Sequence, residues 1–146
     1  MRRLNVAGFT LAEMMLVTGV ITIIMAIGAP LYMRLSNSNQ LDSAANILAQ
    51  DVYQAQTYSR NQAQDSQWGV AVNGQNIILF SGASYATRNS AQDVVYNAPN
   101  AITLSGSSEI VFTKLYGLPV ATATFGLAGG GKTSSVVVNN KGMVEY

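Results

Sequence analysis

The chain has 146 residues, of which 49% are hydrophobic and only 10% are charged, and its formal net charge is +1. This length suits one modest domain with appendages, and the net charge gives no indication of a nucleic-acid partner. The absence of cysteine excludes disulfides and thiolate metal sites. Histidine, the commonest general base and metal ligand, is also absent. We therefore expect no enzyme and no cofactor.

The first segment predicts a helix that spans a membrane. Twenty residues without a charge, 14–33, follow Glu13. As a helix they rise about 1.5 Å per residue and reach roughly 30 Å, the thickness of a bilayer core. Arg2 and Arg3 precede them, and positive charge there favours a cytoplasmic N-terminus. A cleaved secretory signal ending at residues 26–28 is the alternative, but the acidic residue and the apolar run past that point favour the longer helix.

Residues 8–17 read Gly-Phe-Thr-Leu-Ala-Glu-Met-Met-Leu-Val. They resemble the class III signal of type IV pilins and of type II secretion pseudopilins, in which such a short signature precedes a long apolar helix. The resemblance implies cleavage by prepilin peptidase after Gly8, with N-methylation of Phe9. It also implies a structural subunit of a pilus-like filament (a fimbrium) or secretion-system pseudopilus, assembled with other pilin subunits through Phe9, Glu13 and Pro30.

Glu13 needs a physical reason, because an unpaired carboxylate at the edge of hydrocarbon is costly. Cleavage after Gly8 would create an amine on Phe9. The family implies that this amine in one subunit meets the glutamate of its neighbour, which would set the register of assembly. The alternative is that Glu13 is simply solvated among lipid headgroups. The resemblance further implies a single-pass precursor in the cytoplasmic (inner) membrane and then an extracellular or periplasmic filament.

A second helical segment, 34–61, is amphipathic. Its apolar residues are spaced by three and four and share one face: Leu41, Ala45, Leu48, Val52 and Ala55. We expect this segment to continue the membrane helix, although Ser38 or Asn39 would also suit the start of a separate helix. Pro30 predicts a bend, and Thr22 or nearby backbone is a candidate partner for the carbonyl that the proline frees.

Residues 62–146 show the period of strands. Asn73-Gly74 between apolar runs predicts a hairpin of 68–72 with 77–80. The other expected strands are separated by turn residues and lie at 93–96, 102–104, 109–115, 121–127, 134–139 and 143–146. A loop is expected at 81–92. Because one face of the sheet must be covered and the amphipathic helix is the candidate cover, we expect an α+β fold: a long N-terminal helix packed on a small antiparallel sheet. The pilin fold has this layout.

The later strands add weaker points of resemblance. Trp68, the turn at 117–119 (Gly-Leu-Pro) and the ending at 142–144 (Gly-Met-Val) resemble minor, H-type pseudopilins. The implied organisation is a leader at 1–8, a membrane and filament-core helix at 9–33, an amphipathic helix at 34–61 and a head at 62–146. The sequence leaves open whether the chain is a major pilin, a minor pilin or a pseudopilin.

The sequence also contains a pattern typical of nucleotide binding. Gly126–Thr133 matches the nucleotide-binding pattern G-x-x-x-x-G-K-[ST], but β-branched residues rather than a helix follow it, so we expect a hairpin turn and no nucleotide. No acidic cluster typical of a calcium loop and no basic stripe typical of DNA binding is present. A membrane-anchored or secreted β-domain with an unknown ligand remains the alternative function.

Overall fold

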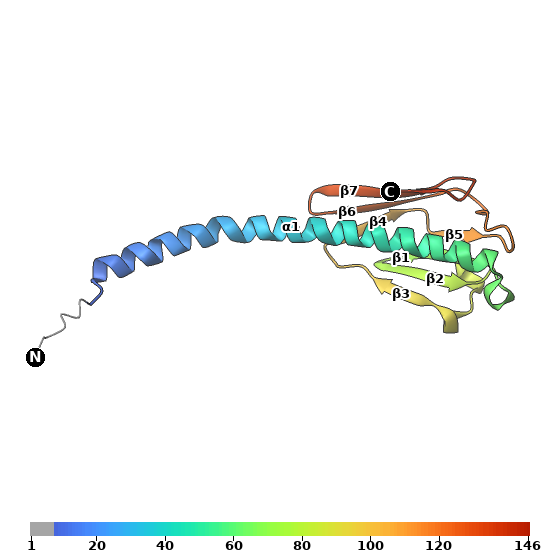
Figure 1. The fold of residues 1–146 in the computed structure, drawn as a ribbon, viewed down its shortest axis with the longest axis horizontal. Coiled ribbons are helices and arrows are strands. Elements are labelled where there is room, and N and C mark those ends of the chain that lie inside the picture. Colours follow the sequence, from blue (N-terminus) through green and yellow to red (C-terminus); the bar gives the residue numbers. More distant parts are fainter. Residues whose placement is uncertain (1–7) are drawn as a thin grey trace, which may run out of the picture. The chain divides into compact units, whose positions relative to one another are not determined.

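A computed structural model describes residues 8–146. A single long helix, α1 (Leu11–Arg60), is followed by eight short strands and three 3-10 turns (Figure 1). Contacts divide the chain into two compact units, one ending at Leu35 and one formed by Ser36–Tyr146. The chain therefore has an α+β architecture, with the strands confined to the second unit.

Helix α1 is continuous through Pro30 and through the change from apolar to polar sequence. The prediction of one helix rather than two is thus confirmed, and Ser38 and Asn39 lie inside it. Proline costs a helix one hydrogen bond, but the residues on either side are good helix formers and maintain the helical conformation. Arg60, in the last turn, complements the negative end of the helix dipole.

The first sheet contains four antiparallel strands in the order β3-β2-β1-β5. Their bounds are Trp68–Asn73 (β1), Asn76–Ser81 (β2), Val94–Asn97 (β3) and Glu109–Phe112 (β5). Asn73 pairs with Asn76 at the end of the predicted hairpin, and Gly74 has a φ of 62°, which its missing side chain permits. The predicted hairpin is confirmed.

The second sheet also has four antiparallel strands, in the order β4-β6-β7-β8. Their bounds are Ile102–Gly106 (β4), Ala123–Gly129 (β6), Lys132–Val138 (β7) and Val144–Glu145 (β8). The expectation of one small sheet was therefore wrong. The chain changes sheets three times, between β3 and β4, between β4 and β5, and between β5 and β6. At the second change, Ser107 N–H donates to the Thr124 carbonyl in the second sheet, and the Ser108 carbonyl accepts from Val72 N–H in the first.

The core lies between α1 and the two sheets. Every residue of the predicted helical stripe is buried, and Ala44 and Ala49 widen it. These side chains join one apolar cluster with residues from both sheets, including Val70, Phe112 and Phe125. Small residues on the helix face let the strands approach closely, while the large residues from the sheets fill the space between them. The amphipathic segment covers the sheets, as predicted.

Every strand differs from its predicted bounds, mostly by one or two residues, and two segments differ further. β5 ends at Phe112 rather than at residue 115, because Thr113 N–H turns to the Leu118 carbonyl at 2.8 Å and Leu115 has a φ of 70°. The expected loop at 81–92 contains two short 3-10 turns, η2 (Tyr85–Thr87) and η3 (Ser90–Gln92). A third, η1 (Ala63–Asp65), follows α1. Ser84 caps η2 with its side chain, and Asn89 caps η3 in the same way.

Candidate functional site

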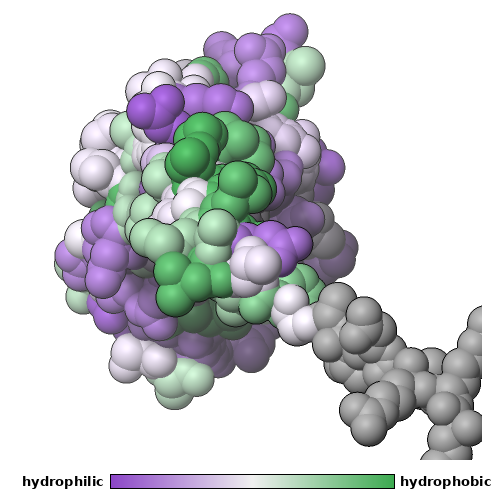
Figure 2. All heavy atoms as spheres, turned by 90° about the vertical axis from the view of Figure 1, so that its left-hand side faces the viewer, coloured by the Kyte–Doolittle hydropathy of each residue, from purple (hydrophilic) through white to green (hydrophobic). Residues whose placement is uncertain are grey.

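The first half of α1 carries an apolar surface that its own unit leaves uncovered. Each large apolar side chain from Phe9 to Leu35 is between 45% and 84% exposed. Figure 2 views the molecule from the side of the N-terminal end of α1, and apolar surface gathers at the centre of that view. α1 is the one described helix that is long and apolar enough to cross a membrane. Large exposed apolar surfaces of this kind are typical of contact with lipid or with protein.

The helix starts at a pair of residues that cap each other. Glu13 Oε2 accepts hydrogen bonds from Thr10 N–H at 3.0 Å and from Thr10 Oγ1 at 3.1 Å. In return, Glu13 N–H donates to Thr10 Oγ1 at 3.2 Å. This reciprocal arrangement is a capping box, which satisfies donors that the first turn of a helix leaves free. This role of Thr10 was not predicted, although the spacing Thr-x-x-Glu before an apolar run is the signal for this motif.

The other two threonine hydroxyls of this half are turned into the helix. Thr18 Oγ1 donates to the Met14 carbonyl at 2.7 Å, and Thr22 Oγ1 donates to the carbonyls of Thr18 and Gly19. Thr22 thus does not serve the carbonyl freed by Pro30, as the sequence analysis considered. In a helix a threonine side chain reaches carbonyls three or four residues before it, whereas the freed carbonyl lies four residues after Thr22. The outward surface therefore stays apolar.

The predicted processing and assembly residues all lie at the exposed N-terminal end or on the apolar half. Gly8 and Phe9 precede the helix and are exposed, and Phe9 is 84% exposed. Glu13 lies in the first turn, and Pro30 lies inside the helix with an exposed side chain. The structure brings Glu13 together with Thr10 but with none of the other three. Arg2, Arg3 and the rest of the predicted leader up to residue 7 lie outside the described residues.

In the second unit, Gln56 connects the two turns that carried the weaker resemblance. Its buried side-chain amide donates to the Gly117 carbonyl at 3.0 Å and to the Gly142 carbonyl at 3.3 Å. A side chain on Gly142 would overlap the Gln56 amide, since an added Cβ would lie 2.3 Å from Nε2. The motif at 117–119 and the motif at 142–144 are therefore held by one residue of α1.

One acidic group of the second unit is electrostatically unusual. Burial without a partner raises the pKa of Asp51 to about 6, against an ordinary value of 3.8. Asp51 takes part in neither of the ion pairs among the described residues, which join Arg88 to Asp93 and Lys114 to Asp65. Its carboxylate lies on α1 beyond the apolar half. A carboxyl group whose pKa is raised in the folded state makes stability depend on pH.

The remaining candidate motif of the sequence analysis forms a hairpin. Gly129 pairs with Lys132, and the turn between β6 and β7 uses positive φ angles at Gly130 and Gly131. The strand β7, not a helix, follows the glycines, so no helix N-terminus is aimed at this loop. Among residues 8–146, no three His, Cys, Asp or Glu side chains gather as metal ligands would.

Comparison with protein families, with curated proteins and with solved structures finds no match to this chain. The features of the described residues that bear on function are the uncovered apolar surface of α1 and, at its start, the Glu13 carboxylate held by Thr10.

Proposed function

We propose that this chain is a structural subunit of a filament of the type IV pilin class, a pilus or a secretion pseudopilus. The observation that supports this most is the uncovered apolar surface from Phe9 to Leu35. Burying one large apolar side chain contributes about 1.5–3 kcal/mol, so this surface strongly favours lipid and then the same surface of neighbouring copies. Helices move between these two surroundings at little cost because their polarity is similar.

Glu13 would direct the assembly. Its Oε2 is engaged by Thr10, and no hydrogen bond within the described residues uses its Oε1. Cleavage after Gly8 would place a positive amine on Phe9 of each subunit. An amine and a carboxylate of neighbouring subunits attract strongly at low dielectric, and either one left alone is costly. Pairing would therefore select one axial position for an incoming subunit.

The proposed processing and assembly are those that the resemblance of residues 8–17 to the class III signal implies. The chain begins as a single-pass precursor in the cytoplasmic membrane, where prepilin peptidase removes residues 1–8 and methylates Phe9. It then leaves the membrane and joins other pilin subunits in an extracellular or periplasmic filament, with residues 9–33, including Pro30, in the filament core. The role is structural, with no enzymatic step and no nucleic acid.

The test is a pair of matched variants produced in the native host. Glu13→Val should abolish recovery of the chain in filaments sheared from the cell surface, while the membrane pool stays at its native level. Glu145→Val removes an exposed carboxylate of the head and should leave filament recovery unchanged. If Glu13→Val is recovered in the sheared fraction like the native chain, Glu13 has no assembly role. The alternative of a membrane-anchored β-domain would then be favoured.

A further inference from the structure

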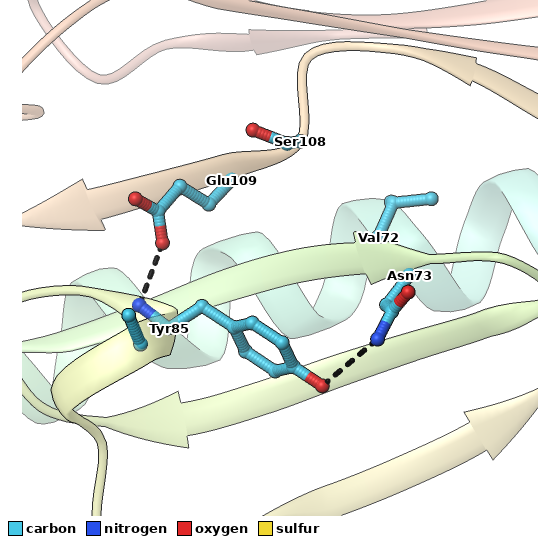
Figure 3. A pocket seen from close by; sticks show the side chains of 6 residues that line it. Val72, Asn73, Tyr85, Ser108 and Glu109 are labelled. Carbon is cyan, nitrogen blue, oxygen red and sulfur yellow. Dashed lines mark hydrogen bonds between the residues drawn. The ribbon is translucent and has the colours of Figure 1, made fainter.

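A hollow of about 330 Å³ lies on the first sheet (Figure 3). Its lining comes from the end of β1, from η2 and from the start of β5: Val72, Asn73, Tyr85, Ala86, Ser108 and Glu109. Ala71 lies opposite Glu109 in the register of β1 and β5, so β1 places only a methyl group beside the carboxylate. Ala71 and Val111 belong to a small apolar cluster separate from the core under α1.

The walls of the hollow are fixed by specific contacts. Tyr85 N–H donates to Glu109 Oε2 at 2.7 Å, and Asn73 Nδ2 donates to the Tyr85 hydroxyl at 3.3 Å. The Tyr85 ring meets Phe80 edge-on at a centroid distance of 5.8 Å, and the Arg88 guanidinium lies 3.8 Å from its centroid. A ligand that enters would not have to order these groups, which favours binding.

The charge of the hollow is negative and uncompensated. Glu109 is half-buried, and it takes part in neither ion pair among the described residues. Arg88, the nearest cation to Tyr85, is already paired with Asp93 at 2.7 Å. No hydrogen bond within residues 8–146 uses Glu109 Oε1. Figure 3 shows Glu109 and Ser108 on one side of the hollow, with Tyr85 and Asn73 on the other.

We propose that this hollow binds a primary ammonium group carried on an aliphatic stem. An ammonium has three N–H donors, which match the free Glu109 oxygen and the Ser108 hydroxyl on the same side. Its stem would lie against Val72 and the Tyr85 ring, while the ammonium stays at Glu109, away from the Arg88 guanidinium over that ring. An anion would be repelled by Glu109, and a neutral ligand would leave its carboxylate without a counter-charge. The ammonium can come from a free alkylamine or from a lysine side chain of a peptide.

The experiment is an amide NMR titration of the full chain in detergent micelles, and it does not depend on filament assembly. The probes are n-butylammonium, Nα-acetyl-lysine methylamide and, as a neutral control, n-butanol. We expect both ammonium probes to shift the amides of Tyr85, Ser108 and Glu109 in a saturable way. n-Butanol should bind at least about fivefold more weakly than n-butylammonium. Saturation by the lysine derivative alone would support the peptide source of the ammonium.

Two variants sharpen the test. Glu109→Gln keeps an acceptor for Tyr85 N–H but removes the charge, and it should weaken ammonium binding about fivefold or more. Glu145→Gln, an exposed carboxylate on β8, should leave binding unchanged. The proposal is overturned if neither ammonium probe gives saturable shifts at the hollow, or if n-butanol binds the native chain as tightly as n-butylammonium. The comparison of n-butanol with n-butylammonium uses the native chain, so it tests the proposal even if Glu109→Gln unfolds.

Discussion

Glu13 has a local role in the capping box at the start of α1 and a proposed role in assembly. Removing its whole side chain would affect both roles at once. One role is local, because its Oε2 holds Thr10 N–H and Oγ1 at 3.0 and 3.1 Å. The other is the proposed pairing of its charge with the Phe9 amine of a neighbour. Glu13→Gln keeps a capping oxygen and removes the charge, since glutamine also serves in a capping box. Thr10→Val keeps the charge and the side-chain shape but removes the hydroxyl.

The two variants should differ in magnitude. Loss of a cap costs about 1 kcal/mol and frays the first turn, so Thr10→Val should lower filament yield by no more than about fivefold. Glu13→Gln would leave the neighbour's amine without an anion in apolar surroundings. An unpaired charge there costs about 2.5–3.5 kcal/mol, which corresponds to about a hundredfold loss of subunit incorporation.

The assay measures the chain in filaments sheared from the native host, divided by the chain in the membrane fraction. Native and Thr10→Val should give yields of the same order, and Glu13→Gln should fall near the detection limit. Backbone hydrogen exchange of the first helical turn, measured in bicelles, should rise for Thr10→Val only. If Thr10→Val loses filaments as completely as Glu13→Gln, capping rather than charge pairing controls assembly, and the reasoning is refuted.

Two further predictions concern the second unit of the chain, each measured by denaturant unfolding of the full chain in micelles. Gln56→Leu leaves the buried carbonyls of Gly117 and Gly142 without donors and should lower the free energy of unfolding by about 2–4 kcal/mol. An unchanged midpoint would show that water replaces the amide. The pKa of Asp51 is raised to about 6, so the folded state binds more protons than the unfolded state between about pH 4 and pH 6. Stability should therefore fall as pH rises through this range, by about 1–2 kcal/mol after allowance for partial exposure. Asp51→Asn should abolish this pH dependence of stability. The control variant Asp42→Asn, at an exposed position, should keep it.

The sequence predicted best where a periodic pattern reports burial directly. The stripe from Leu41 to Ala55 is spaced by three and four, and each of its residues is buried against the sheets. Asn73-Gly74 predicted its hairpin because few residue pairs tolerate the backbone of that turn. The Thr10–Glu13 cap was present in the sequence as Thr-x-x-Glu, but attention to the charge of Glu13 alone missed its partner.

Features set by contacts distant in sequence were not predicted. The division into two sheets depends on pairings between strands far apart in sequence, such as β1 with β5 and β4 with β6, which no local pattern encodes. The end of β5 is a local miss instead: Thr113 turns toward Leu118, five residues on, so the strand stops before the predicted end at Leu115. The hollow at Glu109 arises from the pairing of that residue with Ala71, thirty-eight positions earlier (109 − 71), which no local pattern encodes.

The most direct test of the central claim is the intact mass of the chain in filaments sheared from the native host. The account predicts a chain that lacks Met1–Gly8, begins at Phe9 and carries one additional methyl group. A chain that begins near Ala29, or that is absent from the sheared fraction, would contradict the account. It would leave a secreted or membrane-anchored β-domain in place of a filament subunit.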